Sequence, residues 1–94
     1  MTTQLHTMAS PARLITPLDQ RIQAVFREVL DDDHLEIYDG MTRDNFPAWD
    51  SLTHVKLIIG LEEEFHCQFT TTEVVAIQSI ADLKRTLIDK GVRT

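Results

Sequence analysis

Three segments of the chain carry apolar residues every three or four positions, the spacing of one face of an α-helix. The first covers residues 17–30, and its apolar positions are Leu18, Ile22, Val25, Phe26, Val29 and Leu30. The second covers residues 51–65. Its apolar positions are Val55, Ile58 and Phe65 on one side, Leu52 and Ile59 beside them, and Leu57 and Leu61, which widen the band beyond half the circumference. The third opens near residue 79 with Ile80, Leu83, Leu87 and Ile88.

Polar residues mark where these helices start. Thr16, Pro17 and Asp19 stand where an N-cap, a first helical residue and a capping-box partner belong. The spacing of Thr70 and Glu73 predicts a further, short helix by the same pattern.

The last helix shows a start and an end signal. Ser79 with Asp82 has capping-box spacing, and Gly91 lies where a helix-ending glycine is expected. No segment has the pattern of a strand, so we predict an all-α fold of three longer helices and one short helix.

Residues 31–50 form a long connection, which begins with three aspartates that end the first helix and contains Gly40 and Pro47 as breakers. Its apolar residues are too many for a free loop, and we expect them to pack on the helices; they are Leu35, Ile37, Tyr38, Met41 and Phe46. Residues 1–16 show no period and are expected to be a mobile tail. The predicted domain is 17–91, and 92–94 form a C-terminal tail.

The net charge of the predicted domain indicates which kinds of partner it can bind. From Pro17 onward there are eight basic and fifteen acidic residues, a net charge of −7. Nucleic-acid binding needs clustered Lys and Arg, so this balance disfavours it and favours basic protein surfaces. The single cysteine, Cys67, excludes an internal disulfide. With no secretory leader and no long apolar run, we expect a cytoplasmic protein without membrane insertion.

Ser51 draws attention because it stands between Asp50 and Leu52 at the start of the second helix. A catalytic triad with Asp50 and His54 is disfavoured, because one helical turn cannot align nucleophile, base and orienting carboxylate. The chain also lacks the Gly-x-Ser-x-Gly elbow. We therefore predict no enzymatic activity and no catalytic residue.

Two interpretations of Ser51 remain. Ser51 is a suitable N-cap, but Asp50 is equally suitable and comes one residue earlier. If Asp50 caps the helix, the hydroxyl of Ser51 is exposed at the positive end of the helix dipole, where a phosphate ester is stabilised.

Metal binding finds little support. His66 and Cys67 are adjacent without a second pair at ligand spacing, and Leu35 interrupts the acidic run 31–40 at a position where a calcium loop needs an oxygen ligand. We predict no metal site.

The segment Asp50–Phe65, DSLTHVKLIIGLEEEF, resembles the acyl carrier protein family, whose signature is Asp-Ser-Leu followed by a Val-x-Leu helix that ends in Glu-Glu-Glu-Phe. The order of elements agrees from the first helix to Ile88, about three quarters of the chain. The resemblance implies a small four-helix bundle.

The resemblance also implies a cofactor and partners. Ser51 would carry 4′-phosphopantetheine from coenzyme A, whose thiol holds an acyl or aminoacyl group as a thioester. The implied partners are a phosphopantetheinyl transferase, an activating ligase, and a downstream acyltransferase or synthase, each meeting a monomeric carrier. The residues expected to contact these partners are Asp50, Leu52, Val55, Lys56, Ile59 and Glu62.

The chain departs from carriers of fatty-acid synthesis at Lys56, where those typically have an acidic residue. Lys56 and His54 are expected to interrupt the negative stripe of the docking helix, which indicates a dedicated pathway. Trp49 either shields the arm or packs on the loop, and packing is the favoured interpretation. The cargo stays open, as do two other classes: an unmodified carrier-like interaction module, and an unrelated regulatory bundle.

Overall fold

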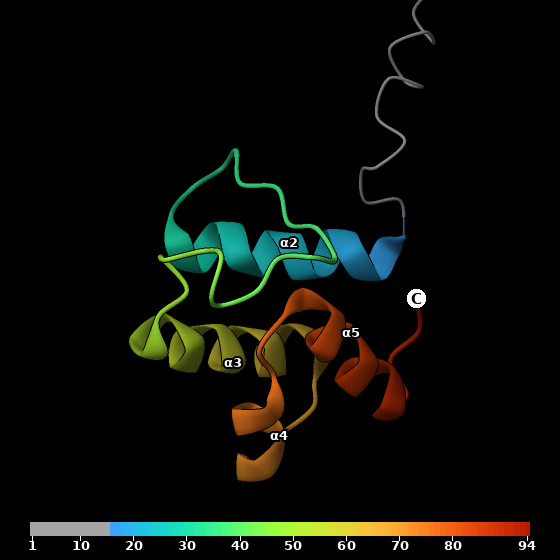
Figure 1. Ribbon diagram of the computed structural model, residues 1–94. Coiled ribbons are helices and arrows are strands. Elements are labelled where there is room, and N and C mark those ends of the chain that lie inside the picture. Colours follow the sequence, from blue (N-terminus) through green and yellow to red (C-terminus); the bar gives the residue numbers. More distant parts are fainter. Residues whose placement is uncertain (1–15) are drawn as a thin grey trace, which may run out of the picture.

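A computed structural model describes residues 16–94 and contains four helices in that range (Figure 1). They are α2 (Pro17–Leu30), α3 (Ser51–Phe65), α4 (Thr71–Ala76) and α5 (Ile80–Asp89). In the same residues the β pairing is one isolated antiparallel bridge between Thr42 and Ser79. The predicted all-α fold, with three longer helices and a short one, is confirmed. The predicted tail, apart from Thr16, lies outside the described residues.

The helices start at the predicted caps. The hydroxyl of Thr16 accepts the amide of Asp19 at 3.0 Å, and Ser79 does the same for Asp82 at 3.0 Å. Thr70 and Glu73 form a reciprocal capping box, with side chain to amide distances of 3.1 and 2.9 Å. These contacts satisfy amides that lack a partner within the helix, which is why short polar side chains define the boundaries.

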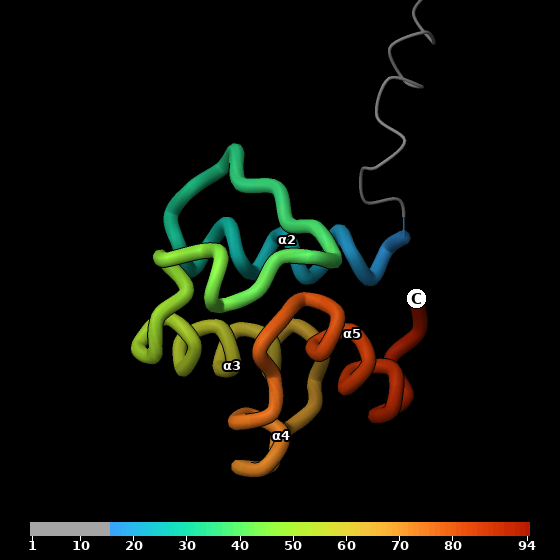
Figure 2. Tube along the Cα trace, in the orientation of Figure 1, coloured from blue at the N-terminus to red at the C-terminus, as the bar shows by residue number. Residues whose placement is uncertain are grey.

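The core lies between α2, α3 and α5, and α2 and α3 run side by side in opposite directions (Figure 2). The fully buried side chains from these three helices are Phe26, Leu18, Ile22, Leu57, Leu61, Ile80, Leu83 and Leu87. Gly60 permits the close approach of α2 and α3, because a Cβ there would lie 2.9 Å from Cγ1 of Val25. No pattern in the sequence indicates this role of Gly60.

Most of the connection 31–50 packs as predicted. Ile37 and Met41 are buried, while Leu35 and Phe46 are partly buried against the core. The prediction was wrong for Tyr38, which is half exposed. The backbone of this loop is also bound to α2, because the Ile37 amide donates to Oε1 of Gln23 at 2.9 Å.

The structure selects which part of the wide apolar band of α3 is buried. His54, Leu57, Ile58, Leu61 and Phe65 are buried. The exposed apolar residues of the helix are Leu52, Val55 and Ile59, at 65%, 52% and 52%. An apolar band wider than half a helix does not define which half meets the core, so the sequence alone left this choice open.

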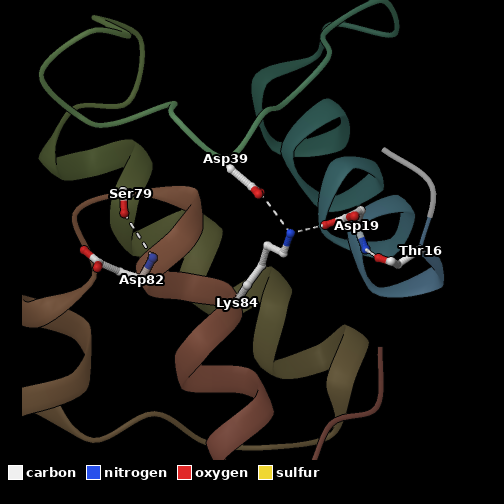
Figure 3. A network of polar contacts seen from close by, with 6 residues as sticks. All are labelled: Thr16, Asp19, Asp39, Ser79, Asp82 and Lys84. Atoms are coloured by element: carbon white, nitrogen blue, oxygen red, sulfur yellow. Dashed lines mark hydrogen bonds and ion pairs between the residues drawn. The ribbon is translucent and has the colours of Figure 1, made fainter. Parts of the chain in front are cut away.

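A polar cluster joins three distant segments at the start of α2 (Figure 3). Nζ of Lys84, on α5, lies 2.7 Å from Oδ1 of Asp19, on α2, and 2.9 Å from Oδ1 of Asp39, in the loop. Burial raises the pKa of Asp19, but hydrogen bonds from Lys84 and Thr16 lower it by more, so the net pKa lies below its ordinary 3.8. The pKa of Lys84 is lowered by burial and raised further by the two carboxylates, to a net value above 10.5.

The chain continues to pack beyond Gly91, which ends α5 with a φ of 98°. The amide of Val92 donates to the carbonyl oxygen of Leu87 at 3.0 Å, and the Val92 side chain packs partly buried against the core. Contacts of the helical domain therefore include the first residue assigned to the C-terminal tail.

Candidate functional site

Ser51 is the exposed first residue of α3, and Asp50 is the N-cap. Oδ1 of Asp50 accepts the amide of Thr53 at 2.9 Å. This hydrogen bond is the main cause that holds the pKa of Asp50 below its ordinary value, so the carboxylate stays charged at neutral pH. Of the two interpretations of Ser51, the capping one is excluded by this geometry, and the hydroxyl of Ser51 is left at the surface.

Arg43 is a neighbour of Ser51 that the sequence analysis missed. Its Nη2 donates to Oγ of Ser51 at 3.4 Å across eight residues of sequence. The backbone holds Arg43 in place, because its amide donates to the carbonyl oxygen of Gln78 at 3.0 Å and Thr42 forms the bridge to Ser79. No local spacing signals such a contact, since it depends on how the loop meets the junction of α4 and α5.

A buried polar chain lies behind Ser51. Nε1 of Trp49 donates to Nδ1 of His54 at 3.0 Å, and Nε2 of His54 lies 2.8 Å from the carbonyl oxygen of Val74 on α4. Trp49 is 2% exposed and packs edge-on against Phe26 at 5.2 Å, which confirms that it packs. The prediction for His54 was wrong: at 5% exposure it belongs to the interior and does not interrupt a surface stripe.

The outward side of α3 is apolar with one cation. Leu52, Val55, Lys56 and Ile59 are all exposed, and their spacing of three, four and seven residues places them on one face. On α4, Val75 is 66% exposed. Isolated exposed apolar side chains are ordinary, but a row of them along the helix that Ser51 begins is a candidate contact surface.

The fold matches a solved structure. The solution structure of a holo acyl carrier protein from Geobacter metallireducens superposes with a TM-score of 0.68 and is 32% identical in sequence. The match covers 80% of this chain and 85% of that one.

This chain belongs to the acyl carrier protein family. Membership supports a carrier role rather than a catalytic one. No protein-family model and no curated protein matches the chain.

In this acyl carrier protein the glutamates at the end of α3 are largely engaged within the domain. Oε2 of Glu62 accepts the amide of Phe69 at 2.8 Å, and Oε2 of Glu64 pairs with Nε of Arg21 at 2.7 Å. Glu62 therefore orders the turn after α3, a role that the sequence analysis did not identify. Glu63 is exposed.

Across residues 16–94, no three His, Cys, Asp or Glu side chains gather in a way that suits a metal ion. No helix in that range is long and apolar enough to cross a membrane. Cys67 is half-buried, and burial raises the pKa of its thiol, which lowers its reactivity at neutral pH.

Proposed function

We propose that this protein carries an acyl or aminoacyl group as a thioester on 4′-phosphopantetheine attached to Oγ of Ser51, and presents it to partner enzymes. One observation carries the proposal: Ser51 stands exposed at the start of α3 while Asp50 does the capping. The similarity to a holo acyl carrier protein adds support.

The residues around Ser51 suit a phosphodiester. The guanidinium of Arg43 already contacts the hydroxyl oxygen, and the N-terminus of a 15-residue helix adds the positive end of its dipole. The carboxylate of the adjacent residue, Asp50, accepts the amide of Thr53. When attached, the group supplies a thiol that holds the cargo on a flexible tether, so that one carrier serves several active sites at high local concentration.

Attachment requires one substitution at phosphorus. The bond from Oγ of Ser51 to the phosphorus next to pantetheine forms, and the pyrophosphate bond of coenzyme A breaks. Adenosine 3′,5′-bisphosphate leaves, and the proton of the serine passes to a base of the phosphopantetheinyl transferase. The role of this chain is to present an accessible hydroxyl with a cation beside it.

The exposed row on α3 is the proposed contact surface for partners. Leu52, Val55 and Ile59 offer apolar contact, and Lys56 adds a positive charge among them. Asp50 and Glu62 complete the proposed set, although both carboxylates also hold backbone amides. A surface of this kind favours dedicated partners over ones that read a purely acidic helix.

The test is the intact mass of the protein after incubation with coenzyme A, Mg²⁺ and a broad-specificity phosphopantetheinyl transferase. We expect a gain of one phosphopantetheine in the natural protein and none in Ser51→Ala. Ser79→Ala is the matched control, because Ser79 caps α5 and is expected to leave modification intact. A folded natural protein that gains no mass contradicts the proposal and favours an unmodified interaction module.

A further inference from the structure

Two hydrogen bonds link Trp49 to His54 and His54 to Val74, and they connect α3 to α4 one helical turn from Ser51. The contact between α3 and α4 at these bonds is called the seam below. An indole N–H only donates, so Nδ1 of His54 accepts and the proton of the neutral ring lies on Nε2. Nε2 then donates to the carbonyl oxygen of Val74, and both ring nitrogens are satisfied. The imidazole therefore fits this seam in one tautomer and one orientation.

Buried apolar side chains flank these two hydrogen bonds. Ile58 on α3 and Ile77 after α4 are buried at 7% and 1% exposure, and Phe26 packs edge-on against the Trp49 ring. An alkyl chain entering between α3 and α4 would have to separate His54 from Trp49 or from Val74. It would leave buried polar groups without partners, a cost that offsets the gain from burying methylene groups.

The groove between α2 and α3 is a poor alternative for an alkyl chain. Its apolar lining comes from Val25, Val29 and Ile59. Four charged side chains border them: Glu28, Lys56, Glu63 and Glu64. Binding sites for apolar groups are mostly apolar and enclosed, and this groove is neither.

We propose that this carrier holds its cargo outside the helix bundle, and that the cargo is a short or polar acyl or aminoacyl group. His54 is the specificity-determining residue, because its two hydrogen bonds exclude a long alkyl chain from the seam next to Ser51. The inference rests on the proposed function of Ser51.

The experiment loads the full-length protein directly. A broad-specificity transferase with acetyl- or octanoyl-coenzyme A places the acylated arm on Ser51 in one step, and intact mass confirms each product. The readouts are the thermal midpoint and the backbone amide shifts of Ile58 and Ile77. In the natural protein we expect equal midpoints for the two cargoes and unchanged core amides.

A variant tests the role of His54. His54→Val removes both hydrogen bonds and leaves space beside Trp49 and Val74 that an alkyl chain can enter without breaking either bond. We expect octanoyl to raise the thermal midpoint of this variant above that of its acetyl form by about 4 °C or more. His34→Val, an exchange at an exposed loop position, is the matched control and is expected to behave like the natural protein.

Two results overturn the inference. One is an octanoyl group that stabilises the natural protein or shifts its core amides; the other is a folded His54→Val that shows no preference for octanoyl. If His54→Val fails to fold, the thermal midpoints and core amide shifts of the acetyl and octanoyl forms of the natural protein are sufficient to test the inference. Failure of the proposed function is distinct, because then no acyl-coenzyme A adds mass to Ser51.

Discussion

The surroundings of Ser51 and of Lys84 use polar side chains in opposite ways. At Ser51 the hydroxyl is exposed, and Arg43 donates one long hydrogen bond to it. At Lys84 the ammonium lies between two carboxylates from distant segments, one of them almost fully buried (Figure 3). The difference shows which polar residues maintain the fold and which stay available for chemistry.

Removing the cation of the Lys84 cluster gives the largest expected loss of stability. Lys84→Met leaves the buried carboxylate of Asp19 without its cationic partner. We expect the free energy of unfolding to fall by about 2 kcal/mol, less than for a fully buried pair because Lys84 keeps some exposure. Urea unfolding at pH 7 measures it. Lys56→Met, an exposed lysine on α3, is expected to change stability by less than about 0.5 kcal/mol. Equal losses in both variants would show that the cluster does not stabilise the fold.

The Lys84 cluster should also make the free energy of unfolding depend on pH. The folded pKa of Asp19 lies below 3.8, so its stabilising contribution is complete above 3.8 and is lost as the pH falls from there through the folded value. The folded pKa of Lys84 lies above 10.5, so its contribution is complete below 10.5 and is lost as the pH rises through the folded value. Urea unfolding between pH 2 and 7 should show that Lys84→Met loses less stability on acidification than the natural protein does. The reason is that Lys84 is one cause of the lowered pKa of Asp19. An unchanged acid profile would mean that Asp19 is not the coupled group.

Three substitutions at helix starts distinguish an N-cap residue from an exposed attachment point. Ser79→Ala is expected to lower the free energy of unfolding by about 1 kcal/mol, because Ser79 holds the amide of Asp82. Asp50→Ala should also lower it, since the amide of Thr53 loses its acceptor. Ser51→Ala is expected to change it by less than about 0.5 kcal/mol. Thermal or urea unfolding of the unmodified proteins measures these changes. If Ser51→Ala lowers the free energy of unfolding as much as Ser79→Ala does, Ser51 has a structural role.

The smallest expected effect concerns Arg43. In the unmodified protein Arg43→Gln removes one long, exposed hydrogen bond and is expected to cost a few tenths of a kcal/mol. If Ser51 carries the proposed phosphodiester, the guanidinium of Arg43 lies beside it. The substitution should then change the ³¹P chemical shift of the modified protein and the dependence of that shift on salt concentration. Arg93→Gln, at an exposed C-terminal position, is the control. Identical ³¹P spectra in both variants would exclude a contact between Arg43 and the phosphate.

Local sequence was sufficient for the helix boundaries and for the position of Ser51. Thr16, Thr70 and Ser79 cap helices through hydrogen bonds to residues three positions later, so their partners are readable from spacing alone. The Asp-Ser-Leu segment with its Glu-Glu-Glu-Phe ending was likewise enough to indicate the family, which the similarity to a solved carrier then established.

Only the tertiary structure decided which side of α3 is buried. The apolar band of α3 exceeds half the helix, and the segments that pack against its buried part include α2 and, through Val74, α4. Burial of His54 depends on Trp49 and on the carbonyl of Val74, and the contact of Arg43 with Ser51 depends on Gln78. These groups lie up to 35 residues apart along the chain, so no helical or turn periodicity relates them. Sequence thus determined where Ser51 stands, and packing of distant segments determined what surrounds it.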